Sequence, residues 1–110
     1  TNDGLWDWDL RSNQIEFSQS FLRMLGYDSL PWPSDLRSFR RYFLHPDDLQ
    51  DLEQQFVNAI EQHQKTLISQ YRLLHKDGSV LWVRTQSKFF EQDETGRPWR
   101  SVGVNTDITD

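Results

Sequence analysis

Adjacent carboxylates, three histidines and scattered serines are the residues of this chain that could do chemistry, and their spacing decides which chemistry is possible. Asp47 and Asp48 have the side chains that general acid–base catalysis uses, but they occupy what reads as the first turn of a helix. The helix dipole favours negative charge there, so it explains both carboxylates. No serine lies in a nucleophile elbow, and the five glycines are spread singly, without a phosphate-cradling loop. The sequence therefore predicts no enzyme active site.

The chain has three histidines and no cysteine, which limits its metal and redox chemistry. His45, His63 and His75 are not spaced as ligand pairs on one helix or hairpin, so we predict no metal site. Without cysteine, disulfides, thiolate metal sites and a cysteine nucleophile are excluded. Flavin photo-adduct chemistry needs a cysteine and is excluded for the same reason.

Length and composition indicate a small soluble domain with one core. The chain has 110 residues, of which 35% are hydrophobic and 14% aromatic, so a core can form despite the short length. The net charge of −5 and the dispersed Lys and Arg disfavour nucleic acid as a partner. No apolar run approaches the roughly 18 residues of a membrane helix, so no membrane contact is expected. We expect a cytoplasmic domain that forms part of a larger protein.

The first half of the chain predicts a hairpin and two short helices. Residues 5–10 alternate apolar and acidic side chains with the period of a half-buried strand, and residues 15–17 continue as a second strand. Ser18 can cap a short helix over residues 19–25. After a loop broken by two prolines, one further short helix carries three apolar residues: Leu36, Phe39 and Phe43.

The second half predicts one longer helix followed by three strands. Pro46 fits the first position of a helix that extends to about residue 62 and has one apolar stripe. Strands are expected over residues 66–75, 80–91 and 99–107, with a tight turn at Asp77-Gly78 and a longer loop through Gly96. Strands and helices segregated in this way favour an α+β fold, an antiparallel sheet with helices on one face.

Five motifs occur in one order over nearly the whole chain. They are Gly4-Leu-Trp-Asp-Trp-Asp-Leu10, Phe21-Leu-Arg-Met-Leu-Gly-Tyr27, Leu44-His-Pro-Asp-Asp48, Arg72 with Lys76-Asp-Gly78 and Trp82, and Asp107-Ile-Thr109. In this order they resemble a PAS domain of the type found in bacterial histidine kinases and diguanylate cyclases. The resemblance implies a five-stranded antiparallel sheet, with short helices and one longer helix on one face. It also implies a single domain over residues 1–110, with a PAC-like segment from about 66 to 110, that senses or relays a signal.

A pocket between the helices and the sheet is the first candidate site. We expect its lining on the helix side to be apolar, opposed by one face of the three-strand meander, a combination typical of small-molecule sites. The candidate residues are Phe39, Phe43, Leu52, Phe56 and Ile60. The alternative is a packed aromatic core without a ligand.

Both faces of the meander carry apolar residues, which indicates that something covers the outer face. Tyr71 and Leu73 point one way while Ile68 points the other, and Trp82 opposes Val83. PAS domains use this surface for dimerisation and for flanking helices. We therefore expect a homodimer through the sheet face that includes Trp82.

The resemblance assigns two further roles. Asp107 and Thr109 match the motif through which PAS domains couple to an effector, here expected C-terminal in the same chain; the alternative is an ordinary strand-end cap. His63 lies on the apolar stripe if the helix continues, as a haem ligand would, although it falls at the helix end. A C-terminal histidine that interacts with the helix dipole is the alternative.

No haem or flavin is predicted. The expected function is a sensor that couples small-ligand binding or dimer geometry to a kinase or cyclase effector. A haem- or flavin-bearing redox or gas sensor and a ligand-free dimerisation module remain the alternatives.

Overall fold

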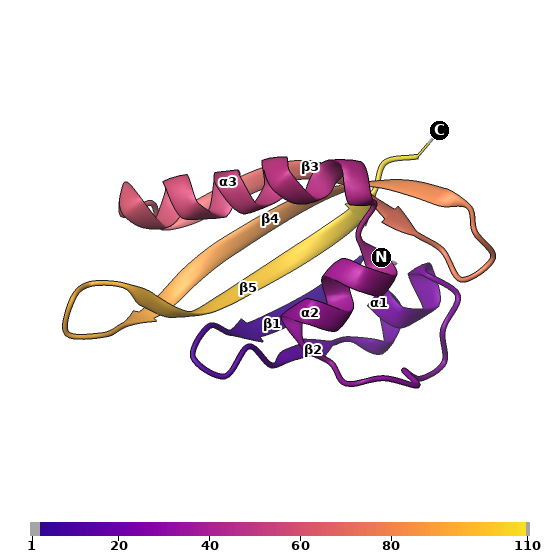
Figure 1. Ribbon diagram of the computed structural model, residues 1–110, viewed down its shortest axis with the longest axis horizontal. Coiled ribbons are helices and arrows are strands. Elements are labelled where there is room, and N and C mark those ends of the chain that lie inside the picture. Colours follow the sequence, from indigo (N-terminus) through magenta and orange to yellow (C-terminus); the bar gives the residue numbers. More distant parts are fainter. Residues whose placement is uncertain (1–2, 110) are drawn as a thin grey trace.

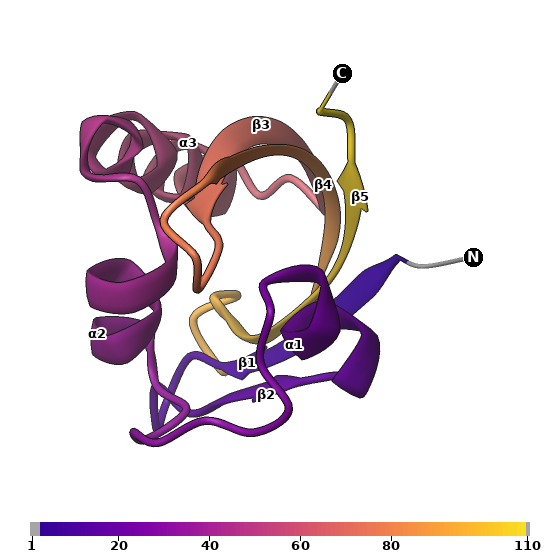
Figure 2. The same ribbon diagram turned by 90° about the vertical axis from the view of Figure 1, so that its right-hand side faces the viewer.

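The computed structural model describes residues 3–109 as one curved antiparallel sheet with helices packed on its concave face (Figures 1 and 2). In chain order the elements are β1 (Gly4–Asp9), β2 (Ile15–Phe17), α1 (Gln19–Met24), α2 (Leu36–Ser38), the π-helical turn η1 (Phe39–Phe43), the 3-10 turn η2 (Pro46–Asp48), α3 (Leu49–Glu61), β3 (Thr66–Leu74), β4 (Val80–Gln92) and β5 (Pro98–Asp107). The predicted α+β fold is confirmed.

The strand order in the sheet is β2-β1-β5-β4-β3, so the last strand lies in the middle. The meander β3–β4–β5 forms as predicted, each strand within two residues of its expected bounds. β1 pairs with β5 along its whole length, from Gly4 opposite Asn105 to Asp9 opposite Arg100. This long-range pairing joins the first hairpin and the meander into one sheet.

Alternation along the strands separates an inner from an outer face. Tyr71, Leu73 and Val83 are buried on the inner face, and Tyr71 and Leu73 share that face as the alternation predicted. On the outer face, Ile68 is 59% exposed and Trp82 is 43% exposed. The outer face of this sheet is therefore partly apolar and uncovered in the single chain.

The helices start and stop close to the predicted positions, with two local differences. Ser18 caps α1 by accepting a hydrogen bond from Phe21 N at 3.1 Å. The short helix after the proline loop widens into the π-helical turn η1. Pro46 opens a 3-10 turn instead of the first turn of α3, and the side chain of His45 caps that turn by accepting from Asp47 N at 3.1 Å.

Two glycines allow close packing that a side chain would prevent. A Cβ on Gly103 would overlap the indole of Trp6, which lies flat across β5. Gly26 follows α1 with a φ of +85° and faces the ring of His75. His75 is thus half-buried against the end of α1.

Candidate functional site

An apolar cavity of about 250 Å³ lies between α3 and the sheet. Four of the predicted lining residues border it: Phe39, Leu52, Phe56 and Ile60. Its volume is just below the roughly 300–1,000 Å³ typical of ligand pockets. The cavity is therefore large enough for a small molecule with a mainly apolar body.

Phe43, the fifth predicted lining residue, does not border the cavity. Its side chain is fully buried in an aromatic cluster. The ring contacts are to Phe17, Phe21, Tyr27, Trp32 and Phe39, at centroid distances of 5.6, 5.9, 5.6, 5.7 and 6.2 Å. The π-helical turn places Phe43 on the core side, a position that the helical spacing in the sequence did not reveal.

The wall opposite α3 also differs from the prediction. Tyr71 is the only described residue of the meander that borders the cavity, and the first hairpin supplies the rest of this wall: Trp6, Trp8, Ile15 and Phe17. Trp8 meets Phe56 edge to face at 5.7 Å, so a wall from β1 contacts a residue of α3 directly. The pairing of β1 with β5 carries the hairpin under the helix and produces this arrangement.

A buried hydrogen-bond network lies beneath two of the cavity residues. Asn105 Oδ1 accepts from Trp6 Nε1 at 3.0 Å and from Thr85 Oγ1 at 2.6 Å. The Thr85 and Tyr71 hydroxyls are 2.8 Å apart, and Asn105 Nδ2 donates to the Tyr71 hydroxyl at 3.4 Å. Burial raises the pKa of Tyr71, which keeps the phenol protonated at neutral pH. The network ties cavity residues of β1 and β3 to β5 near its C-terminal end.

Sequence reasoning missed this network. Its members stand on four different strands, and only the register shows that they meet. A faint signal exists in the sequence, since small polar residues recur at the inner positions of β4 and β5 where apolar ones are expected. These inner residues are Thr85, Ser87, Ser101 and Asn105, all of them buried.

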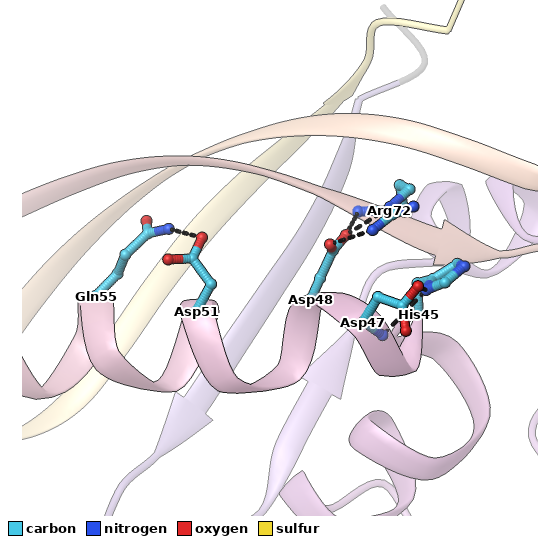
Figure 3. Close-up of polar contacts among 6 residues, drawn as sticks. All are labelled: His45, Asp47, Asp48, Asp51, Gln55 and Arg72. Atoms are coloured by element: carbon cyan, nitrogen blue, oxygen red, sulfur yellow. Dashed lines mark hydrogen bonds and ion pairs between the residues drawn. The ribbon is translucent and has the colours of Figure 1, made fainter.

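The N-terminus of α3 is held to the edge strand by an ion pair (Figure 3). Asp48 accepts from the backbone N–H of Arg72 at 2.7 Å, from Nε at 3.0 Å and from Nη2 at 2.6 Å. The hydrogen bonds from Arg72 hold the pKa of Asp48 below its usual range. Asp47 beside it is exposed, so the two adjacent carboxylates have different environments.

His63 lies outside the cavity. The helix ends at Glu61, and His63 adopts a left-handed backbone with a φ of +54° and an exposed side chain. Continuing the helical rotation placed this residue on the apolar stripe, but the stripe stops with the helix. None of the three histidines borders the cavity, so no histidine is positioned to ligate a haem iron there.

The rim of the cavity carries an ion pair between two elements. Arg40 of η1 and Glu53 of α3 approach to 2.8 Å between Nη2 and Oε1. Both residues border the cavity. The ion pair therefore lies at the edge of the cavity formed by η1 and α3, where the cavity meets solvent.

The predicted exit residues meet β4 at the end of the sheet. Thr109 Oγ1 accepts from Trp82 N at 2.8 Å, and Ile108 N donates to Trp82 O at 2.9 Å. Asp107 Oδ1 accepts from Thr109 N at 2.9 Å, which folds the segment back on itself. Trp82, Asp107 and Thr109 therefore form one hydrogen-bonded unit where the described chain leaves the sheet.

A metal site and a membrane-spanning helix are both absent from the described part of the chain. Among residues 3–90 and 93–109, whose side chains the structure describes, no group of three or more His, Cys, Asp or Glu could hold a metal ion. No helix in the same range is long and apolar enough to cross a membrane.

Three solved structures with a similar fold come from proteins whose names describe sensing. A sensory box histidine kinase/response regulator from Burkholderia thailandensis superposes with a TM-score of 0.81 at 27% identity, covering 99% of this chain and 79% of that one. The N-terminal domain of a diguanylate cyclase with PAS/PAC sensor from Marinobacter aquaeolei gives 0.76 at 21% identity, covering 97% and 95%. A domain of a putative light and redox sensing histidine kinase from Haloarcula marismortui gives 0.76 at 18% identity, covering 99% and 91%.

Comparison with curated proteins finds no match to the sequence. The family model described as PAS fold matches residues 14–105, which includes α3, the meander and most of the cavity wall. The match, the strand order and the five motifs agree, and the chain is a member of the PAS fold family, similar to the sensory domains of histidine kinases and diguanylate cyclases.

Proposed function

We propose that this PAS domain senses a small molecule bound in the cavity under α3 and relays its presence to an effector that follows in the same protein. The observation that carries the proposal is the cavity itself, about 250 Å³ with mainly apolar walls between the helix layer and the sheet. Well-packed cores leave few voids of this size. A cavity that lies beside a buried hydrogen-bond network is better explained as a binding site than as a packing defect.

The route for the signal runs through the sheet. Tyr71 and Trp6 border the cavity and also hydrogen-bond to Asn105 or its partners on β5. Asn105 stands two residues before Asp107, the first residue of the exit motif. A ligand that shifts either cavity residue changes the strand that ends at the exit. The size of the relayed effect is limited to the difference in ligand affinity between the two states.

A second copy of the chain is the proposed occupant of the outer sheet face. Several large apolar side chains are exposed there or at the adjoining strand ends: Leu5, Ile68, Val80 and Trp82. An exposed apolar patch of this kind is typical of an interaction surface. Dimer geometry then offers a second input to the same exit segment. A dimerisation domain without a ligand is the alternative that this surface supports.

We place the parent protein in the bacterial cytoplasm, with a kinase or cyclase effector. Two of the similar structures belong to a histidine kinase and a diguanylate cyclase from bacteria. The cysteine-free composition is compatible with a reducing compartment. Of the haem and flavin sensors that form this alternative, the haem sensor has less support because no histidine borders the cavity. A visible absorption spectrum of the purified protein distinguishes that alternative, since either cofactor gives a coloured protein.

Native mass spectrometry of the purified domain tests the ligand. We expect a fraction of the protein to carry a bound small molecule that is lost on denaturation. Ile60→Trp, which adds bulk from α3 into the cavity, should remove that adduct while the protein stays folded. An adduct of equal amount in the wild type and in Ile60→Trp contradicts binding in the cavity.

A further inference from the structure

The cavity wall is apolar except at its rim, where opposite charges meet. Among the described residues that border the cavity, Arg40 and Glu53 are the charged ones. Their side chains are 39% and 45% exposed, so both charged groups stand between the cavity and solvent. Inside the cavity, the Tyr71 hydroxyl and Trp6 Nε1 are engaged by the Thr85–Asn105 network, whereas Trp8 Nε1 is a buried donor without a partner. The charged groups that a charged ligand could pair with therefore lie at the rim, and the inner wall offers it one neutral donor.

Outside this rim the surface is rich in arginine. A second, polar depression adjoins the cavity because Leu36, Arg40 and Leu49 border both. Its remaining charged residues are Asp35, Arg37 and Arg41. Asp35 is engaged as the cap of α2, accepting from Ser38 N at 2.8 Å, a hydrogen bond that lowers the pKa of the carboxyl. Three arginines (Arg37, Arg40 and Arg41) therefore lie in this region with two carboxylates, Asp35 and Glu53, which leaves the local charge positive.

We propose that the cavity binds a small amphiphilic anion, with its apolar body under α3 and its carboxylate paired with Arg40 in place of Glu53. This inference rests on the proposed function of the cavity as a ligand site. A guanidinium presents donors in a fork that matches a carboxylate, so exchange of one carboxylate for another preserves the charge pairing. Glu53 holds Arg40 at the rim in the unliganded chain and moves to solvent on binding. Arg37 and Arg41 favour the anion further through the local positive charge.

Three probes of matched chain length separate the charge from the apolar body: octanoate, 1-octanol and octylamine. Isothermal titration on the wild-type domain should give tightest binding for octanoate, weaker binding for octanol and the weakest for octylamine. Arg40→Gln should weaken octanoate about tenfold, the effect of a charge-assisted contact at a partly exposed site, and leave octanol unchanged. Arg40→Lys should retain most of the preference for octanoate.

Glu53→Gln provides a test with the opposite sign. It removes the carboxylate that competes for Arg40, so octanoate should bind about threefold or more tightly than to the wild type. A purely structural role for the ion pair predicts that both substitutions weaken binding together. Arg23→Gln on α1, which borders neither depression, is the matched control and should change nothing. Thermal melting of each variant confirms that it is folded.

The outcomes separate this inference from the proposed function. Three results would contradict the proposal of an anionic ligand while leaving the cavity a binding site. They are equal affinities for octanoate and octanol, the tightest binding for octylamine, and a loss of octanoate affinity in Glu53→Gln. If none of the three probes binds and Ile60→Trp has no adduct to remove, the small-molecule function fails as well.

Discussion

Asp48 and Arg72 form a three-bond contact that fixes the start of α3 to the edge strand of the sheet (Figure 3). One bond goes to the backbone of Arg72 and two go to its guanidinium. The same guanidinium lies 5.2 Å from the centre of the Trp82 ring on the neighbouring strand. A single arginine therefore links the helix over the cavity, the edge of the sheet and the residue whose backbone Thr109 holds.

Asp48→Asn should destabilise the domain by about 1–2 kcal/mol, because it removes the charge-assisted part of this contact. Folding lowers the pKa of Asp48, so the contribution is fully present above the ordinary aspartate pKa near 3.9 and is lost as pH falls through the lower folded value. Urea denaturation at neutral pH and near pH 3 measures the change. The wild type should lose stability over this range by more than Asp48→Asn does.

Asp47→Asn is the matched control, since Asp47 is adjacent, lies in the same turn and is exposed. It should change stability by well under 1 kcal/mol. Equal effects of the two substitutions would show that the helix dipole, and not the contact with Arg72, accounts for the role of Asp48.

Asn105→Ala should cost about 2–4 kcal/mol in the free energy of unfolding. It leaves Trp6 Nε1 and the Thr85 hydroxyl without the shared acceptor in a buried site, and such groups cost about 1–3 kcal/mol each when unpaired. Thr106→Ala, on the neighbouring exposed position of β5, is the control and should cost far less. Denaturant melts of both variants make the comparison, and similar losses would deny the network its stabilising role.

Gly26→Ala should destabilise the protein by more than Gly78→Ala. Both positions have positive φ, so both substitutions strain the backbone by about 1–2 kcal/mol. Only at Gly26 would the new Cβ also meet a side chain, the ring of His75, whereas Gly78 has open space around it. Thermal melts of the two single variants, and of Gly26→Ala combined with His75→Ala, measure the difference. If removing the His75 ring does not reduce the extra destabilisation caused by Gly26→Ala, the steric explanation is wrong.

Trp82→Glu should weaken self-association by at least tenfold in dissociation constant, because it puts a charge in the exposed apolar face. Sedimentation over a range of concentrations gives the monomer–dimer balance. Tyr42→Glu is the control, because Tyr42 is an exposed aromatic of η1 and not of the sheet. An unchanged balance in Trp82→Glu excludes this face as the dimer surface.

The local features of the fold were predictable from the sequence because their causes are local. Period-2 alternation identified the strands and their buried faces, and Ser18 and Pro46 marked helical starts. Four of five cavity residues could be named from helical spacing alone. The predictions for Phe43 and His63 were wrong for one reason, which is that the helical period breaks at each residue. Phe43 lies in the π-helical turn, and His63 has a left-handed backbone.

The amino-acid sequence by itself determined the elements, their order and which residues of an element share a face. Tertiary structure decided the rest, since it depends on residues far apart in the chain. Pairing of β1 with β5 brings Trp6 and Trp8 under α3 and places Trp6 beside Asn105, 99 residues away in the chain. Loop closure over such distances is set by the whole set of contacts and not by any local pattern. The cavity, its hydrogen-bonded floor and its charged rim all follow from that pairing and from the packing of the helices against it.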